Sequence, residues 1–234
     1  MATFVLIHGA GTDPWYWGPL ADELRDRGHE VVAPDLPVSD PSAGLTAYAD
    51  TVVDSIAGRD VAHDDLVVVA HSFGGFVGPL VCERVGVSLL VMLHAQIPAP
   101  GESPSEWWQA SGYQAMRDVY DLQPGVPSAD DPRAFALHDA PLELVNEYLL
   151  EHQRDQSDAP FGEPWPLPAW PQVPTRVLIS REDHFFPAHF LRELARERLG
   201  IHADEMPGDH APMLGHPQEL ADRLEDYSRG LSAD

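Results

Sequence analysis

The chain has 234 residues, of which 38 are acidic and 14 basic, giving a formal charge of −24 at pH 7. A surface of this charge repels phosphate backbones and anionic lipid headgroups, so binding to nucleic acid or to a membrane surface is disfavoured. No run of about 18 apolar residues is present, so no membrane-spanning helix is predicted. The single cysteine, Cys82, excludes an intrachain disulfide and a thiolate-rich metal cluster.

The first residues, MATFVLIHGAG, have no basic segment and only a short apolar core. They predict a first β-strand rather than a signal peptide. Together with the lone cysteine, this favours a reducing, cytoplasmic location.

Short runs rich in β-branched residues alternate with amphipathic segments along most of the chain. Predicted strands cover 3–8, 30–34, 65–71, 88–95, 175–180 and, more weakly, 201–206, and predicted helices cover 15–27, 45–57, 73–85, 187–199 and 215–229. Several of the strands are almost wholly apolar, which is typical of strands covered on both faces of a parallel sheet. The alternation predicts an α/β fold with a doubly wound, mainly parallel six-stranded sheet.

Residues 97–171 interrupt this alternation. They contain no convincing strand, many prolines and four of the six tryptophans, with helical patterns at 105–120 and 141–154. A disordered linker rarely carries this much aromatic surface. We expect an inserted helical cap here, within a single domain whose core is formed by residues 1–96 and 172–234.

The stretch VVVAHSFGGF, residues 67–76, passes directly from a predicted strand into a serine and two glycines. A strand followed by small-x-Ser-x-Gly and a helix is the nucleophile-elbow pattern, here with Ala70 in place of the first glycine. Such a turn lifts the Ser72 hydroxyl to the carboxyl end of the sheet, and its small flanking residues let strand and helix approach. The alternative is a serine that caps an ordinary strand–helix turn.

An elbow serine needs a general base and a carboxylate that orients the base, in the chain order Ser, acid, His. Among the twelve histidines, His210 lies in the loop between the last predicted strand and the last helix, at the sheet edge to which the elbow points. Asp183 follows the fifth predicted strand on a neighbouring loop and is the preferred acid. The other candidates are Glu182, Asp35 and Asp209.

The loop after the first strand, IHGAGTDPWYW, is the expected source of a second donor for an oxyanion. The main-chain N–H groups of Ala10 and Phe73 would then face the developing negative charge. The glycines do not form a GxGxxG pattern and no Walker lysine is present, so a phosphate site is not predicted.

Four segments, FVLIHGAG…WYW, VVVAHSFGG, SREDHFFP and GDHAPMLGHPQELA, follow one another from residue 4 to beyond residue 220. Together they resemble the α/β-hydrolase superfamily, and more narrowly the branch of plant methylesterases, hydroxynitrile lyases and their bacterial relatives. The resemblance implies a helical cap over the serine and no metal or organic cofactor. It also implies Ser72 as nucleophile, His210 as general acid–base, Asp183 as its orienting carboxylate, and Ala10 and Phe73 as oxyanion donors.

Two positions bear on the choice among activities. The hydroxynitrile lyases of this branch usually carry a lysine directly after the catalytic histidine and a threonine directly after the oxyanion-loop histidine. This chain has Ala211 and Gly9 there, so the cation that would stabilise departing cyanide is missing. Hydrolysis therefore remains the expected chemistry.

The working hypothesis is a serine hydrolase that cleaves a small, largely apolar carboxylic ester, thioester or lactone through an acyl-enzyme. Trp107 and Trp108 are candidate lining residues of the substrate pocket, or else they pack the cap against the core. Two alternatives stay open: a ligand receptor on the same fold, and a lyase or cyclase that uses the same residues for proton transfer. The expected partner is a small-molecule ester, and the sequence leaves the oligomeric state open.

Overall fold

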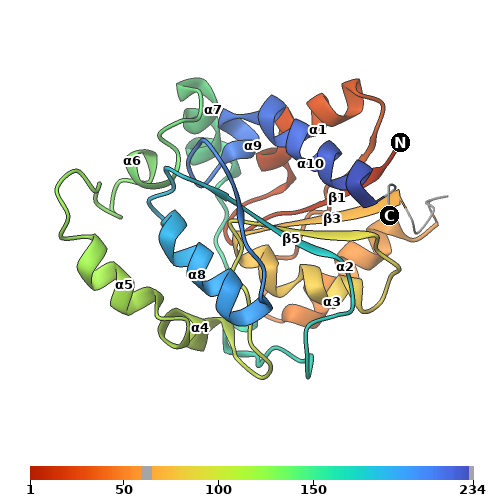
Figure 1. The fold of residues 1–234 in the computed structure, drawn as a ribbon, viewed down its shortest axis with the longest axis horizontal. Coiled ribbons are helices and arrows are strands. Elements are labelled where there is room, and N and C mark those ends of the chain that lie inside the picture. Colours follow the sequence, from red (N-terminus) through yellow and green to blue (C-terminus); the bar gives the residue numbers. More distant parts are fainter. Residues whose placement is uncertain (59–64, 232–234) are drawn as a thin grey trace.

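A computed structural model of the chain describes residues 1–58 and 65–231 and shows one sheet with helices on both faces (Figure 1). The strands are β1 (Thr3–Ile7), β2 (Glu30–Val32), β3 (Leu66–His71), β4 (Leu89–Leu93), β5 (Thr175–Ser180) and β6 (Asp204–Met206). Their order is β2-β1-β3-β4-β5-β6, and every neighbouring pair is parallel. The predicted doubly wound fold is confirmed. Since all strands end at the same edge, the loops that follow β3, β4, β5 and β6 meet there.

Two layers of helices bury the sheet (Figure 1). Side chains along a strand point alternately into one layer and into the other. One layer holds α1 (Gly18–Asp26), α9 (Pro212–Gly215) and α10 (Pro217–Leu231), and the other holds α2 (Leu45–Ile56), α3 (Gly78–Cys82) and α8 (Ala188–Leu199). In β3, Val67 and Val69 pack into the first layer, and Val68 and Ala70 pack into the second. Burial on both sides explains why the strand sequences are apolar runs rather than alternating patterns.

Several predicted elements are shorter or divided in the structure. The helix expected at 73–85 is a 3₁₀ turn, η3 (Ser72–Phe76), followed by the short α3, in which Pro79 occupies the first turn. The expected strand 88–95 ends at Leu93, and the strand 201–206 begins only at Asp204. The expected helix 15–27 begins with a separate 3₁₀ turn, η1 (Pro14–Trp17).

The helices between β4 and β5 belong to the segment 97–171, called the cap segment below. They are α4 (Pro104–Ala110), α5 (Tyr113–Tyr120), α6 (Pro132–Ala136), α7 (Leu142–Glu147), the π turn η4 (Tyr148–His152) and the 3₁₀ turn η5 (Ala159–Gly162). The helix expected at 105–120 is divided because Gly112 adopts a left-handed φ of 80°. Sequence patterns did not indicate α6 or η5, which are only one turn long.

The cap segment is anchored to the core through α8. Arg198 forms an ion pair with Glu102 and also donates to the main-chain carbonyl of Ile97. The indole of Trp107 is fully buried against Phe186 and Phe190. Among the described residues, no helix has the length and apolar character needed to cross a membrane.

Candidate active site

Ser72 directly follows β3 and is the first residue of the turn η3, where its backbone is strained. Its φ is 52°, in the left-handed region that residues other than glycine rarely adopt. The Ser72 carbonyl accepts a hydrogen bond from the Gln96 N–H at 3.0 Å, which ties the turn to the segment after β4. A serine held at this φ between a parallel strand and a helical turn has the geometry of a nucleophile elbow.

The glycines beside Ser72 allow the main chain to approach closely on two sides. A Cβ atom added to Gly75 would lie 1.9 Å from the carbonyl oxygen of Gln96, well inside any allowed contact. A Cβ atom added to Gly9 would lie 3.0 Å from the Cβ of Ser72. Small residues are therefore needed for the elbow to pack against the segments that follow β1 and β4.

Gly75→Ala should lower the free energy of unfolding by about 3 kcal/mol, because the obstructing atom belongs to a buried main chain that cannot move alone. Urea denaturation measures the loss. The matched control is Gly230→Ala in α10, where the added Cβ meets nothing within 4 Å. That change should stabilise the protein by up to about 1 kcal/mol, because alanine is the better helix former. Equal effects of the two substitutions would contradict this explanation of the elbow.

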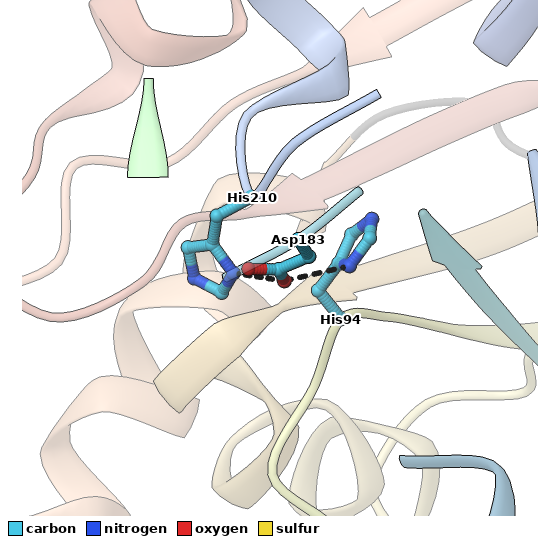
Figure 2. A group of neighbouring side chains, drawn as sticks. All are labelled: His94, Asp183 and His210. Carbon is cyan, nitrogen blue, oxygen red and sulfur yellow. Dashed lines mark hydrogen bonds and ion pairs between the residues drawn. The ribbon is translucent and has the colours of Figure 1, made fainter. Parts of the chain in front are cut away.

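His210 and Asp183 form a buried hydrogen-bonded pair at the carboxyl edge of the sheet (Figure 2). The His210 Nδ1 lies 2.8 Å from the Asp183 Oδ2. An ionised carboxylate only accepts, so Nδ1 carries the proton and Nε2 is left free to act as a base. The other carboxylate oxygen, Oδ1, accepts from the main-chain N–H groups of Phe185 at 2.7 Å and Phe186 at 3.0 Å.

Burial alone would raise the pKa of Asp183. The charge and hydrogen bond of His210, together with the hydrogen bond of a second imidazole, His94, outweigh burial and hold the pKa of Asp183 well below its usual range. The Nδ1 atom of His94 lies 3.2 Å from the same Oδ2 atom that faces His210. Histidine and aspartate also bind metals, but here the Nδ1 atom of each ring lies within hydrogen-bond distance of the same carboxylate oxygen. The cluster is therefore arranged as an acid–base chain.

Ser72 and His210 face the same cavity, which has a volume of about 250 Å³. No side-chain hydrogen bond joins them in the part of the chain that the structure describes. In unliganded enzymes this contact is often long and closes only when substrate binds. Ala10 and Phe73 line the cavity as well. Phe73 lies in the first turn of η3, where main-chain N–H groups have no partner within the helix.

Aromatic and aliphatic side chains from the cap segment and the core form most of the cavity wall. The lining residues are Gly9, Ala10, Thr12, Tyr16, His71, Ser72, Phe73, Gln96, Trp108, Pro132, Ala136, Leu137, Tyr148, Leu149, Gln153, Phe161, Phe185 and His210. Of the two roles considered for the tryptophans, Trp108 lines the cavity. Trp107 does not line it and instead packs the cap segment against the core. Its indole is buried in the core and donates to the Ile97 carbonyl at 3.0 Å.

The other candidate acids have different partners. Glu182 accepts from the Gly208 N–H at 2.8 Å, and Asp35 forms an ion pair with Arg154 at 3.1 Å. Asp209 is buried and accepts from the N–H groups of Ala211 and Asp139, both at 2.8 Å, so it joins the His210 loop to the cap segment. Of the four carboxylates considered, Asp183 is the one that contacts the His210 ring.

Comparison with known proteins gives the family. A family model described as the alpha/beta hydrolase family matches residues 4–223. The chain belongs to the α/β-hydrolase family. This α/β hydrolase is 33% identical to the carbendazim hydrolyzing esterase of Nocardioides sp. (strain SG-4G), over 96% of this chain and 98% of that protein. It is 30% identical to methyl jasmonate esterase 1 of Vitis vinifera, over 98% of this chain and 97% of that protein.

A solved structure shares the whole fold. The pyrethroid hydrolase of Sphingobium faniae JZ-2 is similar to this α/β hydrolase with a TM-score of 0.76 and 23% identity, over 100% of this chain and 99% of that one. The family match and the two relatives confirm the resemblance to plant and bacterial esterases of this superfamily that the four sequence segments first indicated.

Two buried histidines support the site of this α/β hydrolase from behind. The His71 Nε2 donates to the main-chain carbonyl of His210 at 2.9 Å, and the His8 Nε2 accepts from the Leu36 N–H at 3.1 Å. Burial lowers the pKa of both imidazoles, which favours their neutral forms. His94 is a third such residue. It falls inside an expected strand, 88–95, and no sequence pattern distinguished it from its apolar neighbours. Its position directly after a parallel strand, at the edge where Ser72 lies, was the available signal.

Proposed function

We propose that this α/β hydrolase cleaves a small, uncharged and largely apolar carboxylic ester, thioester or lactone through an acyl-enzyme on Ser72. The observation that carries the proposal is the buried Asp183–His210 pair, whose hydrogen-bonded atoms are 2.8 Å apart and whose imidazole lines the same cavity as a serine held at a left-handed φ. The esterase names of the two relatives support the same reaction class.

In the proposed mechanism, the Ser72 Oγ attacks the substrate carbonyl carbon while the His210 Nε2 removes its proton. The carbonyl electron pair moves onto oxygen, where the N–H groups of Ala10 and Phe73 stabilise the charge. The tetrahedral intermediate expels the alcohol, which takes the proton from His210. Water then attacks the acyl-enzyme by the same route and releases the acid. Asp183 stays ionised and stabilises the imidazolium at each step.

The cavity indicates the substrate class. Its wall contains no Asp, Glu, Lys or Arg side chain, so a charged substrate group would lose its hydration without gaining an ion pair. Gln96 offers a polar contact. The Gln96 side chain is 2% exposed, lines the cavity, and its amide nitrogen has no hydrogen-bond partner. We propose that this amide binds a polar atom of an otherwise apolar substrate, because a buried donor left unpaired is costly.

The cap segment is part of the proposal. We propose that residues 97–171 form a helical cap within a single domain, with residues 1–96 and 172–234 as its core, and that the cap determines which acyl group fits. The lining residues contributed by α4, α6, η4 and η5 support this role. We also propose a cytoplasmic location, supported by the single cysteine, and a small-molecule ester as the partner, with no binding to nucleic acid or to a membrane surface, which the charge of −24 supports.

A series of p-nitrophenyl esters with acyl chains from acetate to decanoate tests the function. We expect hydrolysis with the highest kcat/KM for the short acyl groups, because a cavity of about 250 Å³ does not hold a long chain and the leaving group together. The charged control is p-nitrophenyl hemiadipate, matched in carbon number to the hexanoate ester. It should react roughly 100-fold less efficiently, since its carboxylate would be buried without a partner. Absence of turnover with every ester, or preference for the charged one, would refute the proposal.

A further inference from the structure

The carboxylate of Asp183 contacts a second imidazole, that of His94, in addition to His210. The mechanism proposed above assigns no role to His94. We infer that His94 is a positioning residue: it orients the Asp183 carboxylate and limits how strongly that carboxylate draws a proton onto His210. This inference rests on the proposed function and adds a residue to it.

The main chain fixes the position of His94. The residue follows β4 directly, with a φ of 46°, and its N–H donates to the Leu178 carbonyl of β5 at 3.0 Å. Its ring has no exposed surface. Within the described residues, only His94 and Ser72 combine a side chain with a left-handed φ, and both lie at the same edge of the sheet. Such strain persists only where the surroundings fix the residue, and it is concentrated at functional sites.

Ser180 determines which nitrogen of His94 carries the proton. The Ser180 main-chain N–H, which can only donate, lies closer to the Nε2 atom, at 3.1 Å, than to the Nδ1 atom, at 3.4 Å, and the Ser180 Oγ lies 2.9 Å from Nε2. Nε2 is therefore the acceptor, and the ring proton is on Nδ1. Nδ1 faces the Asp183 Oδ2 at 3.2 Å, as Figure 2 shows. Burial is the main cause of a lowered pKa at His94, which keeps the ring neutral.

Asp183 then accepts from four donors: two main-chain N–H groups on Oδ1 and the two imidazoles on Oδ2. The His94 N–H prevents rotation of the carboxylate and shares the negative charge of the atom that His210 contacts. Removing it concentrates that charge on the His210 bond, so the imidazolium becomes more stable. The other titratable groups facing His94 are His71, whose ring centre is 6.4 Å away, and Asp209.

The test compares His94→Gly with His94→Asn. Both new residues adopt a left-handed φ readily, so the backbone strain is matched. Only asparagine keeps a donor near the place of Nδ1. For His94→Gly we expect kcat on the best p-nitrophenyl ester to fall roughly tenfold to 100-fold through loss of orientation. KM should stay within about twofold, because His94 does not line the cavity. The acidic limb of the kcat/KM profile should move to higher pH by roughly half a unit.

His94→Asn should keep kcat within about fivefold of the natural protein and leave the acidic limb in place. The inference is overturned if both variants are equally impaired, or if His94→Gly lowers stability while kcat and the acidic limb stay unchanged. Proton NMR provides a readout that needs no turnover. The strongly deshielded Nδ1 proton of His210 should shift in His94→Gly and not in His94→Asn. An unchanged signal in both would overturn the inference, whereas a shift without any ester hydrolysis would refute only the proposed function.

Discussion

Ser72→Ala should lower kcat/KM for p-nitrophenyl butyrate by at least about 10⁴-fold. The substitution removes the atom that forms the acyl-enzyme and leaves only the residual effect of binding and of the oxyanion donors. Alanine keeps the Cβ atom and must adopt the same left-handed φ of 52°, so the backbone strain is unchanged. The loss of rate therefore reports the hydroxyl alone. Initial rates of nitrophenolate release measure the change. Ser128→Ala, at an exposed position, is the control and should leave the rate unchanged.

The same experiment separates the alternatives raised by the sequence. A ligand receptor on this fold would show no turnover in the natural protein and only a ligand-dependent rise in stability. A lyase or cyclase would depend on Ser72 but would form no acyl intermediate. Undiminished ester hydrolysis in Ser72→Ala would contradict the assigned nucleophile outright.

Asp183→Asn should lower kcat by about 10⁴-fold with little change in KM. The carboxylate accepts from His210 and His94 on one oxygen and from the Phe185 and Phe186 N–H groups on the other. An asparagine amide has only one oxygen, so its NH₂ group must take the place of Oδ1 or of Oδ2. At Oδ2 the NH₂ group cannot accept from His210, and at Oδ1 it faces the N–H groups of Phe185 and Phe186. The negative charge that stabilises the imidazolium is lost as well.

Glu182→Gln provides the matched control for Asp183→Asn. The neighbouring carboxylate loses the same charge, but glutamine keeps an oxygen that can accept from the Gly208 N–H. Steady-state kinetics should place Glu182→Gln within about threefold of the natural protein. If Glu182→Gln loses the activity and Asp183→Asn retains it, the acid has been assigned to the wrong residue.

The sequence was sufficient for the sheet and the elbow because both depend on local patterns. Apolar runs predicted strands buried on two faces, and the small residues around Ser72 predicted a close approach that Gly75 shows in the structure. Asp183 and His210 could then be chosen from the chain order Ser, acid, His, without knowledge of any distance between them. Parallel strands bring the ends of their loops to one edge, so residues far apart in the chain could be placed together.

The remaining features depend on tertiary contacts that no local pattern records. Trp107 and Trp108 are adjacent on one short helix, and only packing against Phe186 and Phe190 sends the first into the core and leaves the second at the cavity. In the sequence, His94 lies within the apolar run 88–95 that predicted a strand, and nothing there marked it as a site residue. Its role depends on a left-handed φ and on Ser180, which follows it by 86 positions.

Covalent labelling tests most directly whether Ser72 is a nucleophile activated by the Asp183–His210 pair. The protein is treated with a fluorophosphonate, digested, and analysed by mass spectrometry. We predict one adduct, on the Ser72 hydroxyl, that is absent in Ser72→Ala and forms far more slowly in His210→Ala. An adduct on any other residue, or unlabelled Ser72 in a protein that hydrolyses esters, would contradict the account.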